Sequence, residues 1–103
     1  VDYALYNFPN PVTTDLTRNP SGRSIGTTIS FKIPDRSHVI VDIYNLKGQR
    51  VKRLFDAKVF PGEFNAFWNG RDDQNNEVST GFYMYRLMID GRVVDTGKCT
   101  FIK

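Results

Sequence analysis

The sequence predicts an all-β fold in which about seven short strands form an antiparallel sandwich. Apolar and polar residues alternate over short segments, and glycine, proline or asparagine separates one segment from the next. No segment keeps a helical period over a useful length. Aromatic residues make up 14% of the chain and lie mostly within the alternating segments. The number and spacing of the segments indicate the immunoglobulin-like kind of sandwich.

The pattern is clearest on either side of a polar stretch at residues 69–80. An apolar set precedes the stretch and another follows it, which predicts a hairpin at the centre of one sheet. Glycine and asparagine in the stretch tolerate the positive φ that tight turns need. Asp72 and Asp73 can accept hydrogen bonds from nearby backbone and close the loop. The two sets are Phe64, Ala66 and Trp68, and Tyr83, Tyr85, Leu87 and Ile89.

The N-terminal part of the chain is expected to be extended. Residues 1–6 are apolar and aromatic and predict an edge strand. Residues 7–11 contain two prolines, which fix φ and lack an amide donor, so this segment should be rigid and extended. Phe8 is expected to pin it to the core. Residues 12–26 are polar and rich in turn residues and predict an exposed loop.

Four more strands are expected along the rest of the chain, at residues 27–33, 39–44, 50–55 and 92–102. In the second of them, Asp42 and Tyr44 should face outward. The inward residues of the four strands are Ile29, Phe31 and Ile33, then Val39, Val41 and Ile43, then Val51 and Leu54, and finally Cys99 and Phe101.

Three turns connect these strands. Residues 45–49 predict a hairpin connection with Gly48 at positive φ. Pro61–Gly62 marks a second turn, and Asp90–Gly91 is the strongest short hairpin signal in the chain. Together the patterns predict a core that contains Phe31, Val41, Ile43, Trp68, Tyr83, Tyr85, Leu87 and Phe101.

The length fits one small domain that covers residues 1–103. With Cys99 as its one cysteine, the chain cannot form an internal disulfide, so packing must stabilise the fold. No apolar run approaches the length of a membrane span, so no membrane insertion is expected. The chain opens with neither a signal peptide nor a methionine, and we expect it to be an excised domain of a longer protein.

The net charge of +3 does not predict nucleic-acid binding. Lys47, Arg50, Lys52 and Arg53 form the dense basic group, and acidic residues are spread through the rest of the chain. A nucleic-acid-binding protein usually concentrates its basic residues more strongly. A solvated turn and edge strand explain this group.

No catalytic constellation and no cofactor motif can be identified, so the chain is not expected to be an enzyme. His38 is the one histidine, and the sequence ties no serine or cysteine nucleophile to it. Cys99 lies on an alternating strand, where a small core residue is a better explanation than a reactive thiol.

The residues Asp73, Asn75 and Glu77 alternate as oxygen ligands do in a calcium-binding loop. The glycine, the distal glutamate and the paired helices of an EF-hand are missing. Hydrogen bonds from aspartate and asparagine side chains to a hairpin loop explain the same residues. We therefore expect no bound metal, and these three residues are the weak candidate for one.

Four further side chains are expected on outward faces of the strands: Tyr44, Phe67, Phe82 and Met84. A row of exposed aromatic residues on a sheet could stack on sugars or bind a partner strand. A second sheet or the parent protein could equally cover them.

Seven segments follow one another along the chain: Asn7–Pro11, Thr27–Pro34, Val41–Val51, Pro61–Gly62, Trp68–Asp72, Gly81–Leu87 and the closing Lys103. Taken in this order, they resemble the C-terminal sorting domain of the type IX (Por) secretion system. The resemblance is to the variant related to the immunoglobulin-like domain of flagellar hook-capping proteins, and it covers nearly the whole chain. The single motifs are weak, and their ordered set is fairly specific.

The sequence departs from the family pattern at two places. Residues 13–26 are longer than the usual link to the next strand, which leaves the subfamily open. Asn76 stands where glycine is common, and asparagine tolerates positive φ.

The resemblance implies a non-catalytic tag that directs a cargo protein through the periplasm and outer membrane to the cell surface. Its partners would be the outer-membrane secretion machinery and an upstream cargo domain. By carry-over from the family, there would be three recognition elements. They are the rigid segment Pro9, Asn10 and Pro11, the turn at Gly48, and the terminal strand that ends at Lys103.

Two alternatives remain open at this point. The same fold could serve as a structural immunoglobulin-like spacer or assembly module, or as a carbohydrate-binding accessory domain of a multidomain extracellular protein. An uncovered edge strand would also allow a homodimer.

Overall fold

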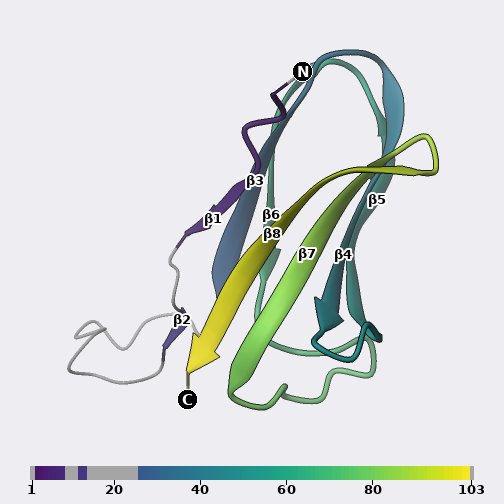
Figure 1. Ribbon diagram of the computed structural model, residues 1–103. Coiled ribbons are helices and arrows are strands. Elements are labelled where there is room, and N and C mark those ends of the chain that lie inside the picture. Colours follow the sequence, from purple (N-terminus) through teal and green to yellow (C-terminus); the bar gives the residue numbers. More distant parts are fainter. Residues whose placement is uncertain (1, 9–11, 14–25, 103) are drawn as a thin grey trace.

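The computed structural model describes residues 2–8, 12–13 and 26–102, which form strands and turns and no helix. Seven strands have three or more residues, and an additional strand, β2, has two. The all-β antiparallel sandwich predicted from the sequence is confirmed (Figure 1). The strands are β1 Tyr6–Phe8, β2 Val12–Thr13, β3 Thr27–Ile33, β4 Ser37–Asn45, β5 Arg50–Val59, β6 Gly62–Trp68, β7 Gly81–Ile89 and β8 Arg92–Ile102.

The strands form two sheets. One sheet has the order β1-β3-β6 and the other has the order β2-β8-β7-β4-β5. Neighbouring strands are antiparallel, except that β2 runs parallel to the end of β8. In immunoglobulin nomenclature, β1, β3 and β6 correspond to strands A, B and E, and β8, β7, β4 and β5 correspond to G, F, C and C′.

The prediction that β6 and β7 form a hairpin is wrong. The two strands belong to different sheets, and the polar stretch 69–80 crosses from one sheet to the other. Both strands alternate because each has one face on the core. An alternating pattern shows that a strand has a buried face, but it does not show which sheet contains that strand.

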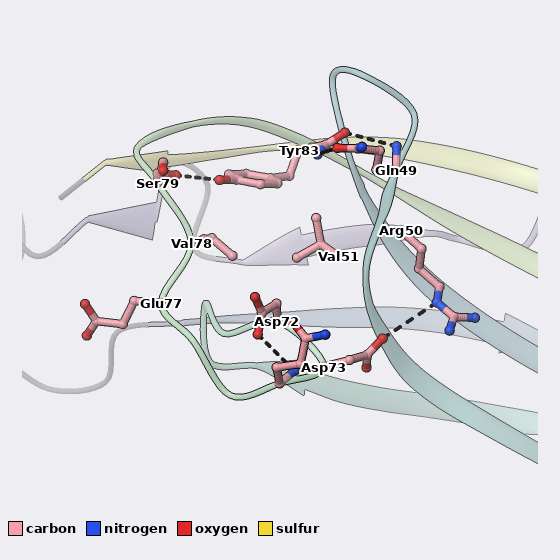
Figure 2. A pocket seen from close by; sticks show the side chains of 11 residues that line it. Gln49, Arg50, Val51, Asp72, Asp73, Glu77, Val78, Ser79 and Tyr83 are labelled. Atoms are coloured by element: carbon pink, nitrogen blue, oxygen red, sulfur yellow. Dashed lines mark hydrogen bonds and ion pairs between the residues drawn. The ribbon is translucent and has the colours of Figure 1, made fainter.

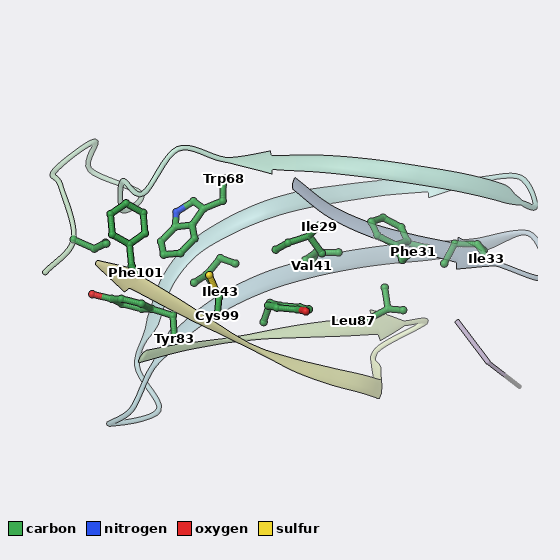
Figure 3. Close-up of a cluster of buried hydrophobic side chains, with 13 residues drawn as sticks. Ile29, Phe31, Ile33, Val41, Ile43, Trp68, Tyr83, Leu87, Cys99 and Phe101 are labelled. Atoms are coloured by element: carbon green, nitrogen blue, oxygen red, sulfur yellow. The ribbon is translucent and has the colours of Figure 1, made fainter. Parts of the chain in front are cut away.

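The core fills the space between the sheets (Figure 3). Trp68 is fully buried there, with its ring centroid 5.4 Å from that of Tyr83 and 5.7 Å from that of Phe101. Burying one large aromatic side chain removes roughly 150–250 Å² from water. The eight residues predicted for the core are all buried, and six more hydrophobic residues join them: Ile29, Ile33, Val39, Ala66, Val78 and Cys99.

The N-terminal segment differs from the prediction. The strand covers residues 6–8 rather than 1–6, and Phe8 is 74% exposed rather than packed on the core. Asn7 pairs with the inward residue Ile29, so the period of two places Asn7 inside and Phe8 outside. Tyr3 and Leu5 pack against the core instead.

Part of the predicted loop at residues 12–26 is also ordered into the sandwich. Val12 and Thr13 form β2, which pairs with Phe101 and Ile102. Gly26 is buried, and a Cβ there would collide with the Phe67 ring and the Trp68 carbonyl. Residues 14–25 lie outside the described part of the chain.

Asp42 lies on the outer face of β4, as expected, but it is fully buried there. Arg53 of the neighbouring strand covers it with two hydrogen bonds, each 3.0 Å long, from Nε to Oδ1 and from Nη2 to Oδ2. This pairing raises the pKa of Arg53 above its ordinary value, against the opposing effect of burial. The charge of Asp42 is therefore compensated on the outer face of the sheet.

The strand β5 extends to Val59, beyond the predicted end at Phe55. Val51 and Leu54, expected to be buried, are half-buried at the margin of the core. Two predicted turns are confirmed: Gly48 has φ 81°, and the Asp90–Gly91 turn has φ values of 50° and 83°.

Replacement of Gly48 or Gly70 by alanine should lower the free energy of unfolding by different amounts. Both Gly70 and Gly48 have positive φ, but a Cβ at Gly70 would collide with the Phe101 ring and one at Gly48 would meet no atom within 4 Å. Gly48→Ala should therefore lower the free energy of unfolding by about 1–2 kcal/mol through backbone strain alone. Gly70→Ala should lower it by about 2–5 kcal/mol, because overpacking adds to the strain. Urea denaturation of both variants measures this, and equal losses would contradict it.

The buried thiol of Cys99 predicts low reactivity and a dependence of stability on pH. Burial raises the pKa of Cys99 to about 11 from its ordinary value of 9.0. Ellman's reagent at pH 8 should react about a hundredfold more slowly with the folded chain than with the chain in urea, since only the thiolate attacks.

The unfolded chain releases the Cys99 proton at lower pH than the folded chain does. The free energy of unfolding should therefore fall as the pH rises from about 9 to about 11. Urea midpoints at pH 8 and pH 10 should differ less for Cys99→Ala than for the original chain. Identical thiol rates in the folded and unfolded chain, or an unchanged pH response in the variant, would show that Cys99 is accessible.

Candidate functional site

A polar groove of about 770 Å³ lies at one end of the sandwich, between the β4–β5 hairpin and the crossing segment 69–80 (Figure 2). We call it the end groove. It lies at the same end of the sandwich as the last residues of β8 (Figure 1). Its lining residues are Asn45, Gln49, Arg50, Val51, Asp72, Asp73, Gln74, Glu77, Val78, Ser79 and Tyr83.

The hairpin wall of the end groove is held by the side chain of Asn45. Its Oδ1 atom accepts hydrogen bonds from the backbone N–H groups of Lys47 and Gln49, both at 3.0 Å, and its Nδ2 atom donates to Gln49 Oε1 at 3.0 Å. The Gly48 amide donates to the Asn45 carbonyl at 3.0 Å. Gly48 is therefore presented at the tip of a hairpin whose conformation is fixed by its neighbours.

The opposite wall is the crossing segment, and Asp72 closes it. Asp72 Oδ1 accepts hydrogen bonds from the backbone N–H groups of Gln74 and Asn76, both at 2.9 Å. Asn75 has φ 66°, the left-handed conformation that asparagine tolerates. The sequence prediction that an aspartate closes this loop is confirmed for Asp72.

Asp73 fastens the crossing segment to β5. Its backbone N–H donates to the Val51 carbonyl at 3.0 Å, and its Oδ1 atom accepts from the Arg53 backbone N–H at 3.1 Å. Its other carboxylate oxygen lies 3.6 Å from Arg50 Nε. The two walls are thus joined at the base of the groove, although the segments are about twenty residues apart in the chain.

Tyr83 lies at the floor of the end groove and ties β7 to the crossing segment. Its hydroxyl donates to the Ser79 carbonyl at 2.5 Å (Figure 2). A tyrosine near the start of strand F that bonds back to the loop before it is the tyrosine corner of immunoglobulin-like sandwiches. Burial raises the pKa of Tyr83, and the hydrogen bond to Ser79 opposes that rise. The four-residue spacing of Ser79 and Tyr83 is the signal in the sequence from which this contact could be predicted.

The weak calcium candidate is not assembled as a cluster of ligands. Asp73 is bonded to β5, Glu77 Oε1 lies 3.6 Å from Arg71 Nη2, and the Asn75 carbonyl accepts from Arg71 Nη1 at 3.0 Å. Within residues 2–8, 12–13 and 26–102, no three His, Cys, Asp or Glu side chains gather in a way that could hold a metal ion. The carboxylates that alternate in the sequence are paired with arginine side chains.

The residues carried over from the family are only partly placed. Gly48 is at the hairpin tip beside the end groove. Pro9, Asn10, Pro11 and Lys103 lie outside the described residues. Their described neighbours are placed: Phe8 pairs with β3 of one sheet, whereas Val12 pairs with the end of β8 in the other.

The candidates for catalysis do not meet. His38 Nε2 lies 2.5 Å from Asp56 Oδ1 on the surface, and its backbone N–H donates to Asp90 Oδ1 at the β7–β8 turn. Cys99 is buried in the core.

In the described part of the chain, no helix is long and apolar enough to cross a membrane.

The outward side chains expected to form one row lie on two sheets. Tyr44, Phe82 and Met84 belong to strands of the larger sheet, and Phe67 belongs to β6 of the smaller one. The Arg86 guanidinium lies over the Tyr44 ring, 4.3 Å from its centroid. Tyr44 therefore does not offer an open ring beside Phe82.

No protein-family model matches the sequence, and no curated protein matches it. Solved structures share the fold. One is PorZ, described as an essential bacterial surface component of the type IX secretion system of Porphyromonas gingivalis. It matches 96% of this chain with a TM-score of 0.58 and 20% sequence identity.

A second is the alkylpurine DNA glycosylase AlkC of Pseudomonas fluorescens, bound to DNA with an abasic-site analogue. It matches 96% of this chain with a TM-score of 0.51 and 14% identity. This chain spans 11% of the PorZ chain and 29% of the AlkC chain. At these identities the likeness shows that the chain has the same β-sandwich fold as a part of each of these larger proteins.

Proposed function

We propose that this chain is a non-catalytic C-terminal sorting domain, which directs a cargo protein through a type IX secretion system to the cell surface. The proposal rests on the ordered set of motifs, which runs from Asn7 to Lys103 and resembles that family. The sandwich shared with PorZ, a surface component of such a system, supports it at the level of the fold.

The observation that carries the proposal is the presentation of Gly48. The hydrogen bonds of Asn45 hold the hairpin rigid, and a Cβ at Gly48 would meet no atom within 4 Å. The hairpin packs against nothing there that would require a glycine for space. A rigid exposed turn beside a polar groove is a surface that a receptor can recognise without large reorganisation.

The end of β8 supplies a second recognition element. Only its last residues, Phe101 and Ile102, pair with β2, and β1 pairs with the other sheet. Within residues 2–8, 12–13 and 26–102, no strand other than β2 pairs with this edge of β8, and a receptor could pair there by adding a strand. The partners in this proposal are the outer-membrane secretion machinery and an upstream cargo domain, and no cofactor takes part.

A transplant experiment tests the proposal. Residues 1–103 are fused to the C-terminus of an inert reporter that is exported to the periplasm of a bacterium with a type IX system. The fusion should carry the reporter to the cell surface or the medium, and removal of residues 92–103 should abolish this. A sorting domain native to the host, tested in parallel, shows that the pathway accepts the reporter.

A matched pair of variants separates recognition from folding. Gly48→Ala and Gly91→Ala both place alanine at positive φ, where a Cβ would meet no atom within 4 Å, so both should cost about 1–2 kcal/mol of stability. Gly48→Ala should lower surface delivery about tenfold more than Gly91→Ala, as expected for loss of about 1.4 kcal/mol of receptor binding. Retention of the folded fusion in the periplasm, while the native domain works, would instead favour the structural-module function.

A further inference from the structure

The outer face of the smaller sheet carries three exposed aromatic side chains, which come from β1 and β6. Tyr6 is 57% exposed, Phe8 is 74% exposed and Phe67 is 52% exposed. Tyr6 and Phe8 are two residues apart on β1, so they project from the same face. We call this group the aromatic patch.

The pairing register places the three rings around two hydrogen-bonding side chains. Strands in a sheet are about 4.8 Å apart, so Phe8 and Phe67 are separated by roughly 10 Å across β3. Residues two apart on one strand are separated by roughly 7 Å. The two rows of this face are Phe8–Thr28–Phe67 and Tyr6–Ser30–Asn65.

The two hydrogen-bonding side chains beside the aromatic patch, Ser30 and Asn65, are uncharged. The Ser30 hydroxyl donates to Asn65 Oδ1 at 2.6 Å, which leaves the Nδ2 hydrogens of Asn65 as donors and the Ser30 oxygen as an acceptor on this face. Tyr6, Ser30 and Asn65 line a hollow of about 150 Å³. At the far end of the same hollow, Lys32 Nζ and Glu63 Oε1 form an ion pair at 3.3 Å and cancel each other's charge.

The Phe67 ring is held in place from behind. It lies over Gly26 so closely that a Cβ there would collide with it. A ring fixed in this way loses little side-chain entropy when a ligand binds to its exposed side.

Size and charge both restrict what the face can bind. Two strands of seven residues and one of three present on the order of 300 Å², less than the ~800 Å² that each partner buries in a stable protein interface. A patch of this size is nevertheless large enough to be functional on a small domain. The balanced charge of Lys32 and Glu63 gives no attraction to a phosphate, an acidic peptide or a basic peptide.

We propose that the aromatic patch is a binding site for a neutral polysaccharide, whose sugar rings stack on Tyr6, Phe8 and Phe67 while its hydroxyl groups bond Ser30 and Asn65. One face of a pyranose ring carries C–H groups, and these are attracted to the electron-rich face of an aromatic ring. The hydroxyl groups at its edge need uncharged donors and acceptors, which lie between the rings. The site is independent of the sorting function, because Gly48 and the end groove do not contribute to it.

The test uses the whole chain and named, uncharged probes. Affinity electrophoresis is run in gels that contain hydroxyethyl cellulose, xylan, glucomannan or laminarin, and pull-downs use insoluble cellulose and chitin. Alginate serves as an acidic polysaccharide for comparison. The chain should be retarded or retained by at least one neutral probe and not by alginate.

Matched variants locate the site. Tyr6→Ala and Phe67→Ala should each weaken binding to the retained probe roughly tenfold, the loss expected when one stacking ring is removed. Phe82→Ala removes a ring that is 58% exposed on the other sheet and should change binding less than about twofold. Thermal unfolding of all three variants shows that each remains folded under the binding conditions.

Four outcomes would overturn the proposal. The first is no retardation or retention on any neutral probe. The second is retention by alginate as strong as that by any neutral probe, and the third is an equal loss in Phe82→Ala and Phe67→Ala. The fourth is a dimer of the original chain, measured by light scattering, that Phe67→Ala dissociates, since the patch would then bind a second copy. None of these outcomes bears on surface delivery, so the sorting proposal is tested separately.

Discussion

The packing of Trp68 between Tyr83 and Phe101 is the interaction on which the rest of the structure depends. Trp68 ends β6 of one sheet, whereas Tyr83 and Phe101 belong to the other sheet, so their edge-to-face contacts join the two layers. The polar ends of these rings also organise the crossing segment: Trp68 Nε1 donates to the Arg71 carbonyl at 2.9 Å, and Tyr83 donates to the Ser79 carbonyl. One cluster therefore provides both the core and the path of the chain between the sheets, in a fold that has no disulfide to do either.

The end groove follows from that cluster. Because the segment 69–80 is fixed by Trp68 and Tyr83, Asp73 can bond to β5 and hold the opposite hairpin beside it. The carboxylates of the end groove are paired with arginine side chains or accept hydrogen bonds from backbone N–H groups. This explains why a sequence that resembles a calcium loop is a structural connection here. Both proposals therefore place recognition on the turns, edges and faces of this scaffold.

Much of the fold could be predicted from the sequence, because alternation and turn chemistry are local. The buried faces of β3 and β7, and the positive φ of Gly48 and of the Asp90–Gly91 turn, follow from residues close together in the chain. The errors arose where the outcome depends on distant residues. The separation of β6 from β7 depends on sheet pairing. The exposure of Phe8 depends on its register with β3, and the burial of Asp42 depends on Arg53 from the neighbouring strand. For the same reason the aromatic patch could not be predicted, since β1 and β6 meet only through β3.

Native-state hydrogen exchange of the Trp68→Phe variant tests the central role of this cluster most directly. The substitution keeps an aromatic ring but removes the indole N–H that bonds Arg71. The amide of Val78, which donates to Gly70, and the amide of Asp72, which donates to Asn76, should exchange roughly tenfold faster than in the original chain. The amide of Gly48 in the β4–β5 hairpin should change much less. If all three amides accelerate equally, or if the crossing segment keeps its protection, Trp68 does not organise that segment and the account is wrong.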